Sequence, residues 1–227
     1  MSADQIITET QLLEPFDRIR LKDHTGAVEL FIAQGSEESL TIQASQEIVQ
    51  KIKTGVRRGQ LDIQIGGTFA EKVTDMFKTT LAHERIRLTL TVKTLNALEV
   101  FGAAKINASS IKTGLLILRI HSAGDVTFKS LTARVLRVEH SGAGILELTG
   151  KAVEQGITLN GAGSYRAPKL ESQKANVLVE GTGNVTIWAV RDLKATVRGI
   201  GSVIYYGNPS VKRRVSGLGS VINLGGR

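Results

Sequence analysis

The chain has 227 residues, of which 41% are hydrophobic, only 4% are aromatic and 24 are glycine, and it contains no cysteine. Apolar residues that are mostly Val, Ile and Leu favour a thin, repetitive β core, and the lack of cysteine excludes disulfides, thiolate metal sites and cysteine nucleophiles. The net charge is +8, and residues 151–227 hold 11 basic but only 4 acidic side chains, which indicates either a solvated surface or attraction to an anionic polymer.

The beginning of the sequence shows no targeting signal. Residues 1–10 lack the basic and apolar regions of a signal peptide. Nowhere in the chain does an apolar stretch approach the roughly 20 residues of a membrane-spanning helix. We therefore expect no transmembrane segment, and two locations stay open: the cytoplasm, or the cell envelope after removal of an export signal.

Residues 15–92 contain alternating apolar residues but follow no fixed repeat length. Residues 45–53 are predicted to form a short helix, with Ser45 as N-cap and Glu47 in the first turn, and residues 69–81 have a mixed pattern that fits a helix or an irregular excursion. We interpret residues 1–92 as irregular first β-coils and an N-terminal cap that covers the end of a longer repetitive structure. Strands are predicted around Ile19, Leu21, Val28, Leu30, Ile32, Leu40, Ile42, Leu61, Ile63, Ile65, Ile86, Leu88, Leu90 and Val92.

From residue 93 onward, a short motif with two small residues recurs at nearly constant spacing. Residues 179–185 have the sequence VEGTGNV, and residues 197–203 and 215–221 repeat the pattern as VRGIGSV and VSGLGSV. The first small residue of each copy falls at positions 102, 122, 142, 161, 181, 199 and 217, in steps of 18 to 20 residues. Copies in one phase indicate structural units stacked on one another.

Each unit also has a period of two. Val177, Val179, Val185 and Ile187 share one parity, while mostly polar residues occupy the other, which predicts strands with one side facing inward. Equivalent strands of successive units run parallel, and such connections are right-handed. We therefore predict an all-β fold, a right-handed parallel β-helix of about 20-residue coils, regular over residues 93–227 and continuous with the irregular N-terminal portion.

The glycine pairs allow two interpretations. A glycine-rich loop can hold phosphate where it opens a helix, but here each pair leads into a predicted strand. We favour a structural corner, at which an inward side chain would collide with the opposite wall. The predicted corner glycines are Gly102, Gly124, Gly142, Gly144, Gly161, Gly163, Gly181, Gly183, Gly199, Gly201, Gly217 and Gly219.

Several phrases of the sequence are similar to one bacterial family. They are FDRIRL at 16–21, IAQG at 32–35, GQLDI at 59–63 and YYGNP at 205–209, the last followed by VSGLGS. With these phrases the chain, over about residues 12–224, resembles the head GIN domain family, labelled "putative auto-transporter adhesins". The resemblance implies a secreted or envelope β-helical protein without known catalytic residues. Two features depart from the family: GAA at 102–104 replaces a usual glycine pair, and the common export signal is absent.

An enzyme is the alternative, because polysaccharide lyases and hydrolases often use right-handed β-helices. Such a site needs carboxylates roughly 5–10 Å apart on one outer face, or a carboxylate Ca²⁺ site. Asp125 and Glu147 fall on neighbouring coils as a single diagonal pair, which a charged surface supplies easily. The four histidines lack the spacing of a metal site, and His140 falls in an inward apolar column. We therefore predict no catalytic residue, no metal and no cofactor.

Two clusters near the end of the sequence are candidates for ligand binding. Trp188 is outward by parity and could stack on a sugar ring, or pack beneath a return loop. Arg213 falls in an inward column, where an unpaired ion would cost several kcal/mol, so the last coil must be open to water. The candidate ligand-binding residues are Trp188, Arg191, Lys194, Lys212, Arg213 and Arg214.

The open last coil is either a polar cap that prevents stacking or a docking platform for an anionic ligand or a second protomer. The expected partners are a glycan or an anionic polymer of the envelope, and a homo-oligomer through the solenoid ends. Nucleic acid is disfavoured, because the basic residues form no stripe with interleaved aromatic residues. We predict a non-enzymatic, adhesin-like surface-recognition protein of the envelope or exterior, with a polysaccharide-active enzyme as the alternative.

Overall fold

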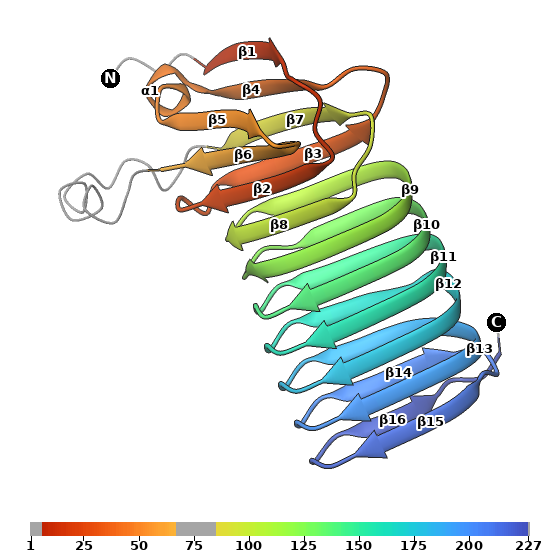
Figure 1. The fold of residues 1–227 in the computed structure, drawn as a ribbon. Helices are drawn as coiled ribbons and strands as arrows, with labels where there is room; N and C mark the ends of the chain where they lie inside the picture. Colours follow the sequence, from red (N-terminus) through yellow and green to blue (C-terminus); the bar gives the residue numbers. More distant parts are fainter. Residues whose placement is uncertain (1–5, 67–84, 227) are drawn as a thin grey trace.

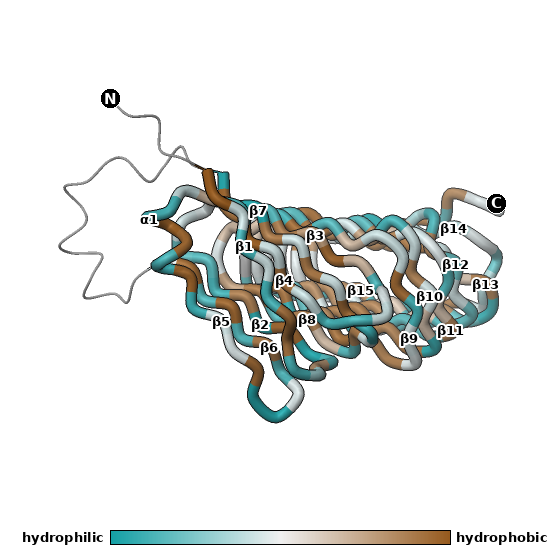
Figure 2. Tube along the Cα trace, turned by 90° about the horizontal axis from the view of Figure 1, so that it is seen from above, coloured by the Kyte–Doolittle hydropathy of each residue, from teal (hydrophilic) through white to brown (hydrophobic). Residues whose placement is uncertain are grey.

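The alternation of apolar and polar residues produces strands along most of the chain, and these strands stack into a solenoid (Figures 1 and 2). The computed structural model describes residues 6–66 and 85–226; it is 71% strand, and its parallel strands form a right-handed coil of about six turns. The predicted parallel β-helix is thus confirmed. The elements are β1 (Ile6–Leu12), β2 (Arg18–Asp23), β3 (Val28–Gln34), β4 (Ser39–Ser45), α1 (Gln46–Val49), β5 (Ile52–Arg57), β6 (Gln60–Ile65), β7 (Ile86–Val92), β8 (Ala97–Gly102), β9 (Lys105–Ser122), β10 (Val126–His140), β11 (Ile145–Leu159), β12 (Ser164–Val179), β13 (Asn184–Val197), β14 (Ser202–Tyr206), β15 (Ser210–Val215) and β16 (Ser220–Asn223).

Each of the long strands β9 to β13 bends and contributes to both faces of the solenoid (Figure 1). Between β10 and β11 the parallel ladder aligns Val126 with Leu146 near its start and His140 with Leu159 at its end, and the register shifts after Phe128, where the strand bends. The two faces are therefore joined on one side by these bends. On the other side they are joined by the glycine-containing turns, which we call the glycine corner.

The strand segments that follow the bends form what we call the return face. It contains, in spatial order, β5, β6, β2, β8, the second halves of β9 to β13, and β15. The first halves of the long strands lie on the opposite face with β3, β7, β14 and β16. In the strands between the two ends of the solenoid, alternate side chains therefore face the interior and the surface.

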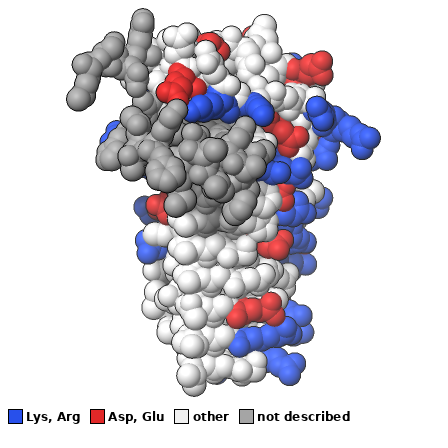
Figure 3. Space-filling model, turned by 90° about the vertical axis from the view of Figure 1, so that its left-hand side faces the viewer, with Lys and Arg blue, Asp and Glu red and all other residues white. Residues whose placement is uncertain are grey.

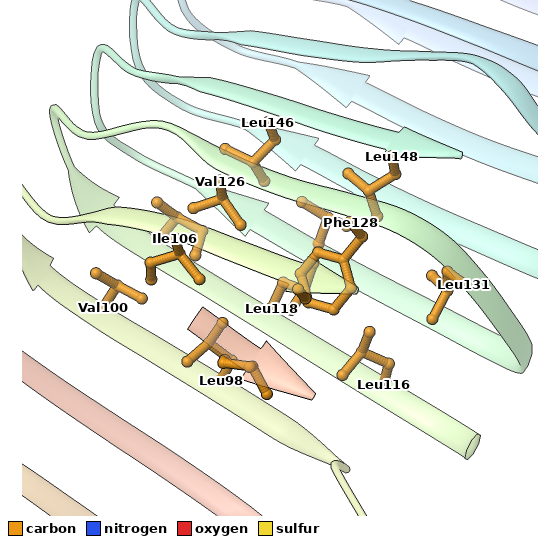
Figure 4. Close-up of a cluster of buried hydrophobic side chains, with 14 of the residues drawn as sticks. Leu98, Val100, Ile106, Leu116, Leu118, Val126, Phe128, Leu131, Leu146 and Leu148 are labelled. Carbon is orange, nitrogen blue, oxygen red and sulfur yellow. The ribbon is translucent and has the colours of Figure 1, made fainter. Parts of the chain in front are cut away.

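The core fills the space between the two faces. Leu98 and Leu118 from the return face meet Ile106, Val126 and Phe128 from the opposite face (Figure 4), and all five side chains are fully buried. Similar columns of aliphatic residues continue through the other coils. Burial of this apolar surface, at about 25 cal/mol per Å², is the main favourable term that holds one coil on the next.

Buried polar side chains within this core have hydrogen-bond partners. His140 is fully buried; its Nε2 lies 2.9 Å from the carbonyl oxygen of Gly144, and its Nδ1 lies 3.4 Å from the backbone nitrogen of Gly142, which donates to it, and 3.2 Å from the carbonyl oxygen of Ile120. These contacts use the polar atoms that burial has removed from water, which is the condition for keeping a polar group in a core. The ring thus belongs to the packing of the coils.

A series of hydrogen bonds between buried polar side chains lies near the bends. The Tyr165 hydroxyl donates to Oε1 of Gln155 (3.0 Å), the Gln155 amide donates to the hydroxyl of Ser172 (2.6 Å), and that hydroxyl donates to the carbonyl oxygen of Trp188 (2.8 Å). Burial raises the pKa of Tyr165 far above its ordinary value, because the phenolate would be desolvated. These hydrogen bonds link three successive coils inside an otherwise apolar interior.

The coils near the N-terminus do not stack in chain order. β2 lies between β6 and β8, and β3 lies between β7 and β9. The coil that comes first in the sequence, β2 with β3, is therefore covered by a coil from later in the sequence, β6 with β7. Beyond that later coil the parallel pattern ends: β4 runs antiparallel to β7, β1 runs antiparallel to β4, and β5 runs antiparallel to β6. These antiparallel strands and α1 lie at the N-terminal end of the solenoid (Figure 1).

The predicted helix over residues 45–53 is too long. α1 spans only Gln46–Val49, and Ser45 stands at the N-cap position without a side-chain cap hydrogen bond. Ile52 already begins β5 and pairs with Ile65, with Ile52 and Val56 packing against the core as alternate residues of a strand. Pairing with β6 outweighs the weak preference of an isolated helical turn. The prediction for residues 69–81 lies outside the described residues.

The corner glycines are required for a reason that the sequence did not reveal. A Cβ atom at Gly183 would lie 1.9 Å from the carbonyl oxygen of Gly163, and one at Gly201 would lie 1.8 Å from that of Gly183. The obstacle is the backbone of the preceding coil, and not the opposite wall as inferred from the pattern. A backbone carbonyl oxygen of a neighbouring coil blocks a Cβ in the same way at Gly102, Gly124, Gly144, Gly161, Gly163, Gly181, Gly199, Gly217 and Gly219.

A matched pair of alanine substitutions tests this steric limit. Gly183→Ala must push two coils apart, so we expect it to lower the free energy of unfolding by at least about 3 kcal/mol, as severe overpacking does. Gly114→Ala in β9 is the control, since nothing lies within 4 Å of the position that the added methyl group would take, and it should change stability little. Urea unfolding followed by circular dichroism measures both. Equal stabilities of the two variants would contradict the role of the carbonyl contact.

Candidate binding groove

Outward side chains on the return face form straight columns, because the parallel ladder aligns equivalent residues of successive coils. One column begins at β9 and ends on two basic residues, with small or uncharged residues at its middle. The neighbouring column lies two residues further along each strand; it also has uncharged residues at its middle and ends on one basic residue. The first column is Ile117, Arg137, Gly156, Asn176, Lys194 and Lys212, and the second is Arg119, Glu139, Thr158, Leu178, Thr196 and Arg214.

The short side chains in the middle of these columns leave a hollow of about 620 Å³. This hollow and its continuation onto β15 are together called the binding groove. Gly156 has no side chain, and Thr158 and Asn176 extend the floor. Arg137 lies on the side of the groove nearer the N-terminus and Lys194 on the other. A smaller hollow of about 240 Å³ continues it onto β15; the two share Lys194, Thr196 and Arg198, and the smaller one adds Lys212, Arg213 and Arg214.

The charges of the groove are balanced on one side only. Arg137 lies 4.0 Å from Glu154 and Arg119 lies 4.0 Å from Glu139. Further toward the N-terminus, Arg20 bonds Glu99 at 2.7 Å, and this hydrogen bond is the main cause that raises the pKa of Arg20. In this part of the return face, acidic and basic side chains of neighbouring coils face each other.

The end of the groove near β13 and β15 is different. Arg198 pairs with Glu180 at 2.8 Å, but among the described residues no carboxylate lies within ion-pair distance of Lys194, Lys212, Arg213 or Arg214. No acidic residue follows Asp192 in the sequence. Figure 3 shows basic side chains along one side of the solenoid, beside the uncharged glycine corner. The resulting positive potential favours an anionic ligand.

The structure brings together four of the six candidate ligand-binding residues. Lys194, Lys212, Arg213 and Arg214 line one continuous surface. Trp188 and Arg191 are not among the residues that line it: Trp188 is half-buried next to the bend, and its carbonyl oxygen accepts a hydrogen bond from Ser172.

Sequence reasoning missed the arginines at the other side of the groove, Arg119 and Arg137, together with Arg198. The signal that could have located them is the repeat itself. Arg137 and Arg119 occupy outward positions of the same twenty-residue phase that aligns Lys194 with Lys212. A basic cluster counted along the sequence does not show that residues several coils apart, such as Arg137 and Lys194, share one column.

Asp125, the first carboxylate of the alternative catalytic pair, has a structural partner. Its Oδ1 accepts a hydrogen bond from the backbone N–H of Ile145 on the next coil (3.0 Å), and Asn184 makes the same contact with Ser202 (3.0 Å). Glu147 lies beside Thr127 in the ladder. The part of the chain that the structure describes holds no cluster of three His, Asp or Glu side chains suited to a metal ion.

The equivalence of Asp125 and Asn184 leads to a test. Asp125→Asn keeps an acceptor oxygen and should leave the free energy of unfolding within about 0.5 kcal/mol of wild type, whereas Asp125→Ala loses the bond and should cost about 1 kcal/mol. Thermal unfolding of both variants measures whether Asp125→Ala is less stable than Asp125→Asn. A polysaccharide-cleaving activity that Asp125→Asn abolished while the fold stayed intact would show instead that the carboxylate is catalytic.

The comparison with solved structures supports the fold over nearly the whole chain. The crystal structure of a putative adhesin from Bacteroides fragilis has a TM-score of 0.87 and 24% identity, with 98% of each chain covered. A putative adhesin from Parabacteroides distasonis has a TM-score of 0.70 and 18% identity, with 97% of each chain covered. A structure from the same species named "putative lipid binding protein" has a TM-score of 0.68 and 16% identity, with 96% of each covered.

The search of curated proteins gave no match, and among the described residues no helix is long and apolar enough to cross a membrane. The family model described as "putative auto-transporter adhesin, head GIN domain" matches residues 15–209. This match covers most of the chain and includes the phrases that carried the resemblance at 16–21, 32–35, 59–63 and 205–209. The chain belongs to the head GIN domain family of putative auto-transporter adhesins.

Proposed function

We propose that this protein is a non-enzymatic surface-recognition protein of the cell envelope or exterior, and that the binding groove holds an anionic polymer such as an acidic glycan. The observation that carries the proposal is the cluster Lys194, Lys212, Arg213 and Arg214, which lacks ion-pair partners among the described residues and lines an open hollow. The family's description as adhesins supports a role at the surface, and thereby also the location.

The shape of the site favours a linear ligand. From Arg119 on β9 to Lys212 on β15 the groove crosses six adjacent strands, which at about 4.8 Å per strand is about 24 Å. The floor between the cations presents the hydroxyl and amide groups of Thr158, Asn176 and Thr196, which can hydrogen-bond to a sugar. Anionic groups at intervals along a chain would meet cations at both sides of the groove, with uncharged groups between them.

A lipid inside the solenoid is disfavoured for this chain, although one relative is named a lipid binding protein. The interior between the two faces is filled by the side chains of the core, and the hollows found among the described residues lie at the surface. Catalysis on a bound polymer is disfavoured because the groove contains one carboxylate, Glu139, which faces Arg119.

Charge removal in the groove is the direct test. The triple variant Arg119→Ser, Arg137→Ser, Lys194→Ser removes three exposed cations, and we expect it to weaken binding to polygalacturonate, alginate or an acidic hit of a glycan array by at least about tenfold. Wild-type binding should weaken as salt is raised, because exposed charges are screened. Isothermal titration at two ionic strengths measures both effects.

The matched control is Lys22→Ser, Lys53→Ser, Arg57→Ser, which removes three exposed cations from the other end of the same face. It changes the net charge equally but should leave affinity nearly unchanged. If both variants lost the same affinity for the polymer, net charge alone would explain binding, and the proposal that the polymer binds in the groove would be wrong. The same polymers should also be assayed for cleavage by the wild-type protein. Cleavage would favour the alternative that the protein is a polysaccharide-active enzyme.

A further inference from the structure

The last coil of the described structure, residues 210–224, exposes an unusual number of large apolar side chains. Leu218, at the tip of its glycine turn, is 85% exposed, and Leu224 is 54% exposed. Val215 and Ile222 of the same coil and Ile200 of the turn before it are also exposed. Earlier turns of the glycine corner carry alanine or threonine at the position of Ile200 and Leu218. Exposed apolar groups gathered at one end of a protein mark an interaction surface.

The same coil carries Lys212, Arg213 and Arg214 on β15. Residues 193–227 include six basic residues and no acidic residue. Exposed apolar and basic side chains therefore occur together in the coil at one end of the solenoid, with β15 on one face and β16 on the other (Figure 1). A surface with this composition fits an anionic lipid bilayer, whose headgroups attract cations and whose boundary accepts apolar side chains.

The opposite end of the solenoid provides an internal contrast. β1 also exposes large apolar residues, with Ile6 at 74% and Leu12 at 77%, but its one charged residue is Glu9. Apolar exposure thus occurs at both described ends, whereas apolar exposure together with an excess of cations occurs at the end formed by β15 and β16.

Arg213 argues against a second copy as the occupant of this end. It aligns with Ala195, which is fully buried in the coil before it, so a coil stacked below would enclose the Arg213 guanidinium. Two copies meeting end to end through this coil would bury two like charges without partners, a markedly unfavourable arrangement in a low-dielectric interface. Lipid phosphates, by contrast, supply counter-charges and leave the free backbone groups of β15 and β16 in a polar, hydrated layer.

We propose that the last coil docks end-on onto anionic membrane surfaces. Leu218, Ile222 and Leu224 enter the boundary between headgroups and acyl chains, and Lys212, Arg213 and Arg214 contact lipid phosphates. The axis of the solenoid then stands away from the membrane, with β1 at the far end and the binding groove along the side. Membrane docking goes beyond the proposed polymer recognition and does not depend on it.

Vesicle co-sedimentation of the full chain tests the proposal. The protein should sediment with vesicles of phosphatidylglycerol and phosphatidylcholine in equal parts, and should stay in the supernatant with vesicles of phosphatidylcholine alone. Leu218→Ser with Ile222→Ser should lower the partition coefficient at least about tenfold. Lys212→Ser, Arg213→Ser, Arg214→Ser should lower it on the order of 100-fold, at about fivefold for each cation near an anionic surface.

The control is Ile6→Ser with Leu12→Ser, which removes two exposed large apolar residues at the other end and should leave vesicle binding unchanged. The Leu218 and Ile222 variant should also keep wild-type affinity for soluble anionic polymer, which separates membrane docking from the groove. Wild-type-like vesicle binding by that variant, or no binding to phosphatidylglycerol by wild type, would overturn the proposal. The proposal would also be overturned if light scattering showed the wild-type protein to be a dimer and the Leu218 and Ile222 variant to be a monomer, since a second copy would then occupy the last coil.

Discussion

The structure depends on one constraint: successive coils must stay in register at the spacing of a parallel hydrogen-bonded ladder. At that spacing the glycine corner leaves no room for a Cβ, so Gly183 and Gly201 contact the backbone of the coil before them. The same spacing places Val126 directly against Leu146, and each apolar column continues through the core. Register, corner and core are therefore three consequences of one geometry, and a change in any of them must disturb the others.

The same register determines the outer surface. Alternate residues of each strand must point outward, so the return face carries columns in which Arg137, Asn176 and Lys194 follow one another at intervals of whole coils. Where facing positions have opposite charge, as at Arg20 and Glu99, the column is internally balanced. Acidic residues end after Asp192, so the cations further along the column face no carboxylate of their own chain, and there we propose that external anions bind. A solenoid can thus acquire a binding surface by exchanging outward residues without any change to its core.

The two described ends of the solenoid solve the problem of open strand edges differently. At the N-terminal end the chain reverses its strands, and β1, β4 and β5 pair antiparallel with their neighbours. At the other end β15 and β16 keep the parallel pattern, and Arg213 takes the place of a core residue. A charge at that position opposes further stacking. It also leaves the last coil available for partners that supply counter-charge, which gives the rod two chemically distinct ends.

The sequence by itself determined the period of two, the spacing of the glycines and hence the parallel stack, because these patterns are local and repeat in every coil. The exposed, basic character of the last coil could also be anticipated from Arg213 in an inward column. Only the tertiary structure decided the placement of β2 between β6 and β8, the early end of α1 and the burial of Gln155 near the bends. It also decided that Arg137 rather than Trp188 shares the surface of Lys194. Each of these depends on pairing between residues far apart in the chain, which alternation within a strand cannot specify.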